Sequence, residues 1–241
     1  MAEERPVVAI VGASSGIGRA TAQRFLQDGW RVAALARRGH LLEELFAASG
    51  AGPDRALPWA GDATRLPDLQ GFVAAVDARW GRLDVLVLNQ GLNIRRRALA
   101  ELTPEDWERV RAVNLDAAFY GTHAALPILR RQGGGLIIYI SSVSGLWPDA
   151  SGAAYQAAKH GLRGLAHAVR VEEQVHGVRA SVVYPGIVNT PLVLNRPRVP
   201  SPEELERALQ PEDVAACCAF LASLPPRVVV TDLVLRPRDV S

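Results

Sequence analysis

Short apolar runs alternate with longer amphipathic segments along almost the whole chain. Val7–Val11 is a run of apolar, mostly β-branched residues followed by Gly12, which predicts a buried strand. Ile17–Asp28 has apolar residues at helical spacing and is followed by Gly29, which predicts a helix. By the same criteria, further strands are expected at Arg31–Ala36, Ala56–Trp59, Asp84–Leu88, Leu136–Ile140, Arg179–Tyr184 and Val228–Leu235. Further helices are expected at His40–Ala48, Leu66–Trp80, Pro104–Arg131 with a break near Asn114, Gly152–His176, Glu203–Leu209 and Glu212–Leu224.

Continuous apolar strands separated by helices predict a parallel sheet that is covered on both faces. The expected fold class is therefore α/β, a Rossmann-like doubly wound sheet of about seven strands. Neither a linker-like Gly/Ser tract nor an internal repeat divides the chain, so residues 1–241 are expected to form one cofactor-binding and catalytic domain. If one segment of the chain is a mobile loop, the sequence favours Pro191–Pro202, which is rich in Pro and Arg.

Composition narrows the classes of function. A net charge of +2 with scattered positive residues does not favour nucleic acid as a partner. The chain has no apolar run near the roughly 20 residues of a membrane helix and starts without a charged-then-apolar leader, so a cytoplasmic protein without a membrane partner is expected. The adjacent Cys217 and Cys218, and five histidines without ligand spacing, predict neither a disulfide framework nor a metal site.

One dense basic cluster stands out, Arg95-Arg96-Arg97. It is expected to be a solvated loop, and the alternative is an anion-binding edge of a site.

The chain has 26 arginines and a single lysine, Lys159, which lies four residues after Tyr155. An ammonium is a compact point charge and a guanidinium is a planar fork, so a lysine kept at one position suggests chemistry that arginine cannot supply. Positions i and i+4 share one face of a helix, so the cation is expected beside the phenol.

A glycine-rich turn, Gly12-Ala13-Ser14-Ser15-Gly16-Ile17-Gly18, separates the first strand from the first helix. Glycines let the backbone approach a pyrophosphate, and the helix N-terminus favours its negative charge. After the second strand, where an NAD site usually has an acidic residue, the chain has Arg37 and Arg38, which favours the 2′-phosphate of NADP(H).

Polar or glycine residues follow four further strands. They are Asp62, Asn89-Gln90-Gly91, Ser141-Ser142 and Pro185-Gly186. Ligands of open parallel sheets bind beyond the carboxyl ends of the strands, so these residues are expected to line a dinucleotide site.

Together these motifs resemble the short-chain dehydrogenase/reductase family along the whole chain, with Asn114, Thr190 and the thirteen-residue spacing from Ser142 to Tyr155 as further matches. The tail from Gln210 onward is similar to the branch of NADP-dependent hydroxy-acid and serine dehydrogenases. Leu88 and Gln90 depart from the family's usual Asn-Asn-Ala-Gly, and Gln90 places a longer side chain near the expected cofactor path.

The resemblance implies an NADP(H)-dependent oxidoreductase that acts on a small-molecule carbonyl or secondary alcohol, needs no metal, and forms a homo-oligomer, either a tetramer or a dimer. Tyr155 would be the acid/base, Ser142 would hydrogen-bond the substrate oxygen, and Asn114 would hold a water in a proton relay. Lys159 would hold the nicotinamide ribose, and its charge, together with that of an oxidised nicotinamide, is expected to lower the pKa of Tyr155 from ~10. The implied cofactor contacts are Gly12, Ser14, Ser15, Gly16, Ile17, Gly18, Arg37, Arg38, Asp62, Ala63, Asn89, Gly91, Tyr155, Lys159, Pro185, Gly186, Val188 and Thr190.

The substrate pocket is expected to be mainly apolar, lined by Leu146, Trp147 and Pro148 and closed by Leu192–Leu194. Capture of a substrate carboxylate by Arg95–Arg97 or Arg196 is a further hypothesis. Two alternatives to a general carbonyl reductase stay open. One is a 3-oxoacyl carrier-protein reductase, and the other is a catalytically silent NADP-binding sensor on the same fold.

Overall fold

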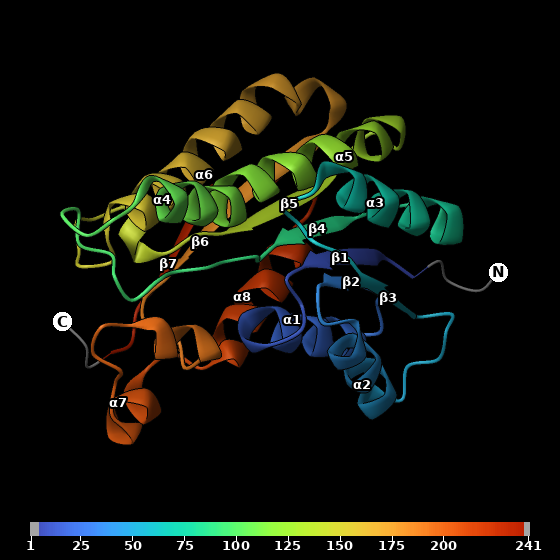
Figure 1. The fold of residues 1–241 in the computed structure, drawn as a ribbon. Helices are drawn as coiled ribbons and strands as arrows, with labels where there is room; N and C mark the ends of the chain where they lie inside the picture. The colour runs from blue at the N-terminus through green and yellow to red at the C-terminus, as the bar shows by residue number, and fades with distance from the viewer. Residues whose placement is uncertain (1–4, 239–241) are drawn as a thin grey trace.

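The computed structural model describes residues 5–238 and contains a seven-stranded sheet in the order β3-β2-β1-β4-β5-β6-β7 (Figure 1). Every neighbouring pair of strands is parallel, which confirms the doubly wound sheet predicted from the sequence. The strand order reverses between β1 and β4, the position at which open α/β sheets bind their ligands. The strands are β1 Val7–Val11, β2 Arg31–Ala36, β3 Ala56–Ala60, β4 Val85–Leu88, β5 Gly135–Ile140, β6 Val178–Pro185 and β7 Asp232–Leu235.

Helices cover both faces of this sheet. On one face lie α1 Gly16–Gln27, α2 Gly39–Ser49 and α8 Pro211–Ser223, and on the other lie α3 Leu66–Trp80, α4 Pro104–Arg111, α5 Ala117–Arg131 and α6 Ala153–Glu172 (Figure 1). Strand β1 is apolar throughout because both of its faces are buried. Val7, Ala9 and Val11 pack into one core, whereas Val8 and Ile10 pack into the other. Because successive side chains point to opposite faces, a strand buried on both sides needs an apolar residue at every position.

Two expected helices are shorter than the sequence pattern indicated. The long helix expected to reach His176 ends as α6 at Glu172, and a 3₁₀ turn, Gln174–His176, follows it. The helix expected at Glu203–Leu209 is α7, Pro202–Arg207, and begins with a Ser201 capping box. It ends before Leu209 because Leu209 forms a parallel β-bridge with Val188.

The last strand is also shorter than expected, since β7 does not begin at Val228 but at Asp232. The Val228 amide closes a turn onto the carbonyl of Pro225 at 2.8 Å, and the Val228 carbonyl accepts from Arg179 Nη1 at 2.9 Å. With both backbone groups engaged, Val228 cannot pair with β6.

Within Pro191–Pro202, the stretch expected to be a loop, residues Pro191–Asn195 form a 3₁₀ turn. No helix within residues 5–238 is both long and apolar enough to cross a membrane. The same residues hold no cluster of histidine, cysteine, aspartate or glutamate side chains that could bind a metal ion.

Candidate active site

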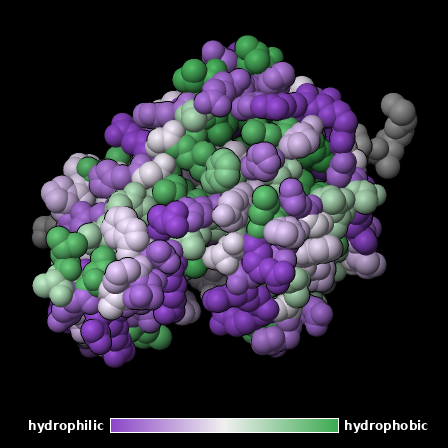
Figure 2. Space-filling view, turned by 45° about the horizontal axis from the view of Figure 1, so that its top comes forward, coloured by the Kyte–Doolittle hydropathy of each residue, from purple (hydrophilic) through white to green (hydrophobic). Residues whose placement is uncertain are grey.

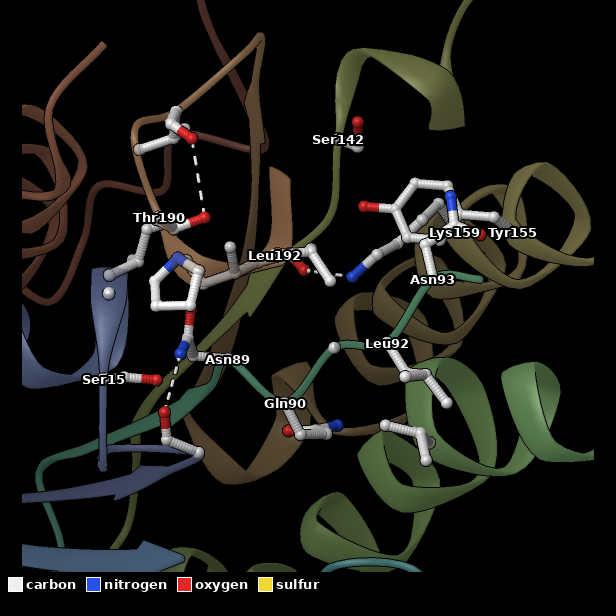
Figure 3. Close-up of a pocket in the computed structure, with 18 of the residues that line it drawn as sticks. Ser15, Asn89, Gln90, Leu92, Asn93, Ser142, Tyr155, Lys159, Thr190 and Leu192 are labelled. Carbon is white, nitrogen blue, oxygen red and sulfur yellow. Dashed lines mark hydrogen bonds between the residues drawn. The ribbon is translucent and has the colours of Figure 1, made fainter. Parts of the chain in front are cut away.

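A single cavity of about 650 Å³ runs along the carboxyl ends of the strands. It is lined by the glycine-rich turn after β1, by the residues after β4 and β5, by α6 and by the segment after β6. Figure 3 shows Ser15 and Asn89 on one side of this cavity and Ser142, Tyr155 and Lys159 on the other. The face of the molecule drawn in Figure 2 mixes hydrophilic and hydrophobic residues.

The glycine-rich turn leaves an open cradle at the N-terminus of α1. Gly12 has a positive φ of 85°, and a Cβ there would lie 3.0 Å from the backbone of Gln90. A Cβ on Gly18 would lie 2.2 Å from the Gly12 carbonyl oxygen, so only glycine fits at this position. No side chain caps the helix at Ser15, which leaves its first amides free for an anion. The cradle therefore fits the pyrophosphate of a dinucleotide.

The two arginines after β2 lie at this end of the cavity. Arg38 donates from Nη2 to Ser14 Oγ at 2.9 Å and to Ser15 Oγ at 3.2 Å. Both Arg37 and Arg38 line the cavity, and both are exposed. The geometry fits a phosphate held between the guanidinium of Arg38 and the glycine turn.

Asp62, which follows β3, is held in place by Thr64. Its Oδ1 accepts from the Thr64 amide at 2.9 Å and from the Thr64 hydroxyl at 2.8 Å. Burial acts to raise the pKa of Asp62, but these hydrogen bonds and the charges of Arg37 and Arg65 outweigh it and lower that pKa. The carboxylate is therefore ionised and can accept hydrogen bonds from a ligand, and Ala63 lines the cavity beside it.

The residues after β4 join the two halves of the sheet. Asn89 donates from Nδ2 to the Gly12 carbonyl at 2.9 Å, a bond drawn in Figure 3, and so fixes the glycine turn to β4. Gln90 lines the cavity, but its side chain is almost fully buried and its Oε1 has no hydrogen-bond partner within residues 5–238. A buried acceptor left unpaired costs free energy, so Gln90 is a strained choice at this position.

The opposite wall follows β6. The cavity is bordered here by Pro185, Gly186, Val188 and Thr190. Thr190 lies close to Gly16, because a Cβ on Gly16 would lie 3.0 Å from Thr190 Cγ2. The residues expected to contact the cofactor thus border one continuous space, except Gly18, whose role is to let α1 pack closely against β1.

Ser142, Tyr155 and Lys159 meet at the other end of the cavity, as their register along the chain predicted. Lys159 Nζ lies 5.6 Å from the centre of the Tyr155 ring, so the expected cation–phenol pair is present on one face of α6. Lys159 is buried, and its Nζ donates to the Ile140 carbonyl at 2.9 Å. Ser142 Oγ donates to Ser144 Oγ at 3.1 Å, which orients the hydroxyl at the end of β5.

The expected direction of the Tyr155 pKa shift is wrong for this structure. The Tyr155 ring is partly exposed to the cavity, yet burial dominates and raises its pKa to about 12, although Ser142 opposes the rise. The cations that lower this pKa are Arg196 and Arg97 and not Lys159. Burial lowers the pKa of Lys159 itself to about 7, so at neutral pH the amine carries only part of its charge.

Asn114 lies in a break of the helix, as expected. Residues Ala112–Asp116 form one π-helical turn between α4 and α5. The Asn114 side chain donates from Nδ2 to the carbonyls of Val110 at 2.8 Å and Leu92 at 2.7 Å. Because the side chain takes the Val110 carbonyl, a normal helical acceptor four residues back, the regular ladder is interrupted. A water relay through Asn114 stays a prediction.

The substrate end of the cavity differs from the expectation of an apolar pocket. Leu146, Trp147, Pro148 and Leu194 do not border it, and Trp147 is instead half exposed beneath the Arg236 guanidinium, 5.8 Å from its ring centre. Leu192 and Val193 border it as expected. The cavity is also lined by apolar residues, among them Leu92, Ala112, Val113 and Val143. Its polar lining includes four residues that the sequence did not indicate, Asn93, Ser144, Asp149 and Ser151, and two arginines that it did, Arg97 and Arg196.

Arg97 also departs from the solvated loop expected for the basic cluster. Arg95 and Arg96 are exposed, but Arg97 is only 9% exposed. The run of three arginines carries no sign of which member turns inward. The alternative interpretation, an anion-binding edge, fits the position of Arg97 in the cavity wall.

Comparisons with known proteins agree with this geometry. A family model described as short chain dehydrogenase matches residues 6–198. Levodione reductase from Leifsonia aquatica is 31% identical, over 90% of this chain and 87% of its own length. The NADP-dependent 3-hydroxy acid dehydrogenase of Shigella flexneri is 30% identical, over 96% of this chain and 94% of its own length.

A solved structure shows the same fold. The crystal structure of 3-ketoacyl-(acyl-carrier-protein) reductase from Brucella melitensis, complexed with NADH, superposes with a TM-score of 0.89. It is 26% identical in sequence, and the match covers 98% of each chain.

Proposed function

Because this chain belongs to the short-chain dehydrogenase family of oxidoreductases, we propose that it is an NADP(H)-dependent carbonyl reductase/alcohol dehydrogenase with Tyr155 as its acid/base. The observation that carries the proposal is the meeting of Ser142, Tyr155 and Lys159 in the cavity that also contains the phosphate cradle. A silent sensor needs the cradle but has no use for an acid–base pair.

In the reduction of a carbonyl, a bound nicotinamide supplies the hydride. The protein's own residues position the substrate and supply the proton. Ser142 Oγ donates a hydrogen bond to the substrate oxygen and steadies the negative charge that develops there. The Tyr155 hydroxyl donates the proton to that oxygen, and its raised pKa of about 12 keeps the phenol protonated until it is needed. Lys159 Nζ would hold the nicotinamide ribose from the same face of α6.

The choice of NADP(H) rests on Arg37 and Arg38. The Shigella relative is described as NADP-dependent, whereas the Brucella structure contains NADH, so the preference of this chain is argued from its own residues. Arg38 is anchored on Ser14 and Ser15 at the rim of the cradle and can pair with a 2′-phosphate through two donors.

A 3-oxoacyl carrier-protein reductase is the second candidate, and the similarity to the Brucella enzyme favours it. That function needs a basic surface on which an acidic carrier docks. The net charge of this chain is only +2, and its arginines are scattered along the sequence, so they permit such a surface but do not single it out.

A screen of NADPH oxidation against ketones, oxo acids and acyl thioesters separates these functions. We expect turnover with a free carbonyl compound and loss of about 100-fold to 10,000-fold in kcat for Tyr155→Phe. This variant should still bind NADPH, which calorimetry would measure. Tight NADPH binding without turnover of any carbonyl would contradict the proposal in favour of a sensor, and turnover of the carrier-linked thioester alone would favour the second candidate.

We further infer that residues 1–241 act as one catalytic unit that is cytoplasmic and assembles into a dimer or tetramer. The helix α6 and the turn after it expose Val171 and Val175, which are 70% and 77% accessible and would be covered in an assembly. A monomer in light scattering at working concentration would refute the assembly.

A further inference from the structure

We propose that Arg97 and Arg196 form an anion-binding pair beside Tyr155, and that the physiological substrate is a carbonyl compound carrying a carboxylate. The inference rests on the proposed function, since it names the class of substrate that the same site would take. It is drawn from the two guanidiniums in the wall of the cavity near the phenol and from the lack of an acidic partner for either within residues 5–238.

Arg97 is built into the wall. It is 9% exposed, and it donates from Nε to the Ile94 carbonyl at 2.7 Å and from Nη2 to the Asn195 carbonyl at 2.5 Å. Gly152, at the start of α6, packs directly on its stem, because a Cβ on Gly152 would lie 2.7 Å from Arg97 Cβ. A long charged side chain is held in one place by these contacts, so it is preorganised for binding.

The charge of Arg97 is not neutralised by the protein. Neither Arg97 nor Arg196 forms an ion pair in the described part of the chain, and Arg97 Nη1 has no hydrogen-bond partner there. Burial and the neighbouring charge of Arg196 lower the pKa of Arg97, and the opposing effects of Tyr155 and Asp149 do not restore it. Arg97 is buried and has carbonyl acceptors but no ionic partner in the described part of the chain, whereas Arg196 is exposed. A buried charge without an ionic partner is costly, and an anionic ligand would relieve that cost.

One carboxylate, Asp149, faces the same group. It acts electrostatically on both Arg97 and Tyr155, but its oxygens are already engaged. Its Oδ2 accepts from Ser144 Oγ at 2.5 Å, and its Oδ1 accepts from the Ser151 amide at 2.8 Å. Arg97 and Arg196 thus face one carboxylate, Asp149, which already accepts hydrogen bonds from Ser144 and Ser151, so the three charges together are net positive.

The pair cannot be explained as a cofactor phosphate site. The phosphate cradle and Arg38 lie at the glycine turn, at the opposite end of the cavity from Tyr155. Arg97 and Arg196 instead act on the Tyr155 hydroxyl, the group that would protonate the substrate. An anion bound by them would belong to the molecule whose carbonyl meets Tyr155.

The test compares 2-oxo-, 3-oxo- and 4-oxopentanoate with their methyl esters, using NADPH-loaded protein. We expect the best acid to exceed its ester in kcat/KM by about tenfold or more. Arg196→Gln should remove most of this advantage, so that the ratio of kcat/KM for the acid to kcat/KM for the ester falls toward one, chiefly through a higher KM for the acid. Arg198→Gln is the matched control, because Arg198 lies two residues away, pairs with Glu204 at 2.8 Å and does not line the cavity. It should behave like the unaltered protein.

A binding measurement separates failure of this inference from failure of the proposed function. Pentanoate and pentanamide are titrated by calorimetry into the NADPH-loaded protein, and neither can be reduced. Tighter binding of pentanoate that Arg196→Gln abolishes would support the anion pair even if no carbonyl were turned over. Equal binding of acid and amide, or an acid preference that survives in Arg196→Gln, would overturn it. Arg97→Lys should weaken the binding of pentanoate in the same way, and its melting temperature should be unchanged.

Discussion

Replacing Lys159 by arginine keeps a positive charge at the site and should nevertheless remove most of the activity. The ammonium is buried, donates to the Ile140 carbonyl at 2.9 Å and lies under the Tyr155 ring. A planar guanidinium is larger and points its donors in fixed directions, so it cannot occupy this position without displacing the ring or β5.

The magnitude follows from the interactions that are lost. A hydrogen bond involving a charged group contributes about 1.5–3 kcal/mol, and a factor of ten in rate corresponds to about 1.4 kcal/mol. Loss of one such contact to the nicotinamide ribose should therefore lower kcat/KM by roughly ten- to 150-fold.

The pH dependence of stability gives a second, independent readout. The pKa of Lys159 is about 7 in the fold, against 10.5 for an unperturbed lysine, so the folded protein loses this proton first as pH rises. Stability of the unaltered protein therefore rises from pH 7 toward pH 10.5, as the lysine becomes neutral in the fold. Arginine cannot deprotonate in this range. The destabilisation of Lys159→Arg should therefore grow by roughly 2–3 kcal/mol between about pH 6 and pH 9.

Thermal or urea unfolding at pH 6 and pH 9 measures this difference, and NADPH oxidation measures the rate. Lys159→Met is the control, because it fills similar space without a charge. Its stability should lack the rise between pH 6 and pH 9 that the titration of Lys159 gives the unaltered protein, while its activity is low. If Lys159→Arg retains normal activity, or if its stability deficit is the same at both pH values, the role given to the buried amine is refuted.

Three further predictions concern the cofactor end of the site. In fluorescence titrations, NADPH should bind about tenfold or more tightly than NADH, and Arg38→Gln should remove most of that preference without changing the affinity for NADH. Equal affinities for the two cofactors in the unaltered protein would exclude a role for Arg38 in selecting the cofactor. Gln90→Met should stabilise the fold by about 1 kcal/mol in urea unfolding, because it removes a buried acceptor without a partner among the described residues; a loss of stability would show that Oε1 is satisfied in solution. Gly18→Ala should destabilise the protein and abolish NADPH binding, since its Cβ would lie 2.2 Å from the Gly12 carbonyl, and normal binding in calorimetry would disprove the close packing of α1.

The fold could be predicted because its elements are specified locally. Strand β1 and helix α3 have the bounds that apolar periodicity and flanking glycines indicated. The meeting of the proposed catalytic residues also followed from spacing, since Tyr155 and Lys159 share a helix face and Ser142 follows the neighbouring strand. Errors arose where a tertiary contact overruled local preference, as when Arg179 took the carbonyl of Val228 and shortened β7.

The substrate end could not be predicted, because it depends on side-chain direction in loops. Nothing in the sequence distinguishes Arg97, which turns inward, from its exposed neighbours Arg95 and Arg96. Trp147 was expected in the pocket because it follows β5, but it packs under Arg236 outside it. The sign of the Tyr155 pKa shift was missed for a related reason. Sequence spacing indicates that Lys159 lies near Tyr155, but it does not indicate how deeply the two side chains are buried.

The structure also gives a physical reason for the lone lysine in an arginine-rich chain. At 3% exposure, and with burial as the only influence on its pKa, Lys159 has no carboxylate within residues 5–238 to offset its charge. A group in that position must be able to release its proton when the site is empty and regain it when a ligand supplies hydrogen-bond acceptors. Lysine can do so near neutral pH, whereas arginine stays charged and would carry the full cost of burial. Arg97 can remain an arginine because two backbone carbonyls share its charge and the cavity can provide an anion. Under the proposed function, Lys159 and Arg97 are thus matched to different partners, a neutral ribose for Lys159 and a carboxylate for Arg97.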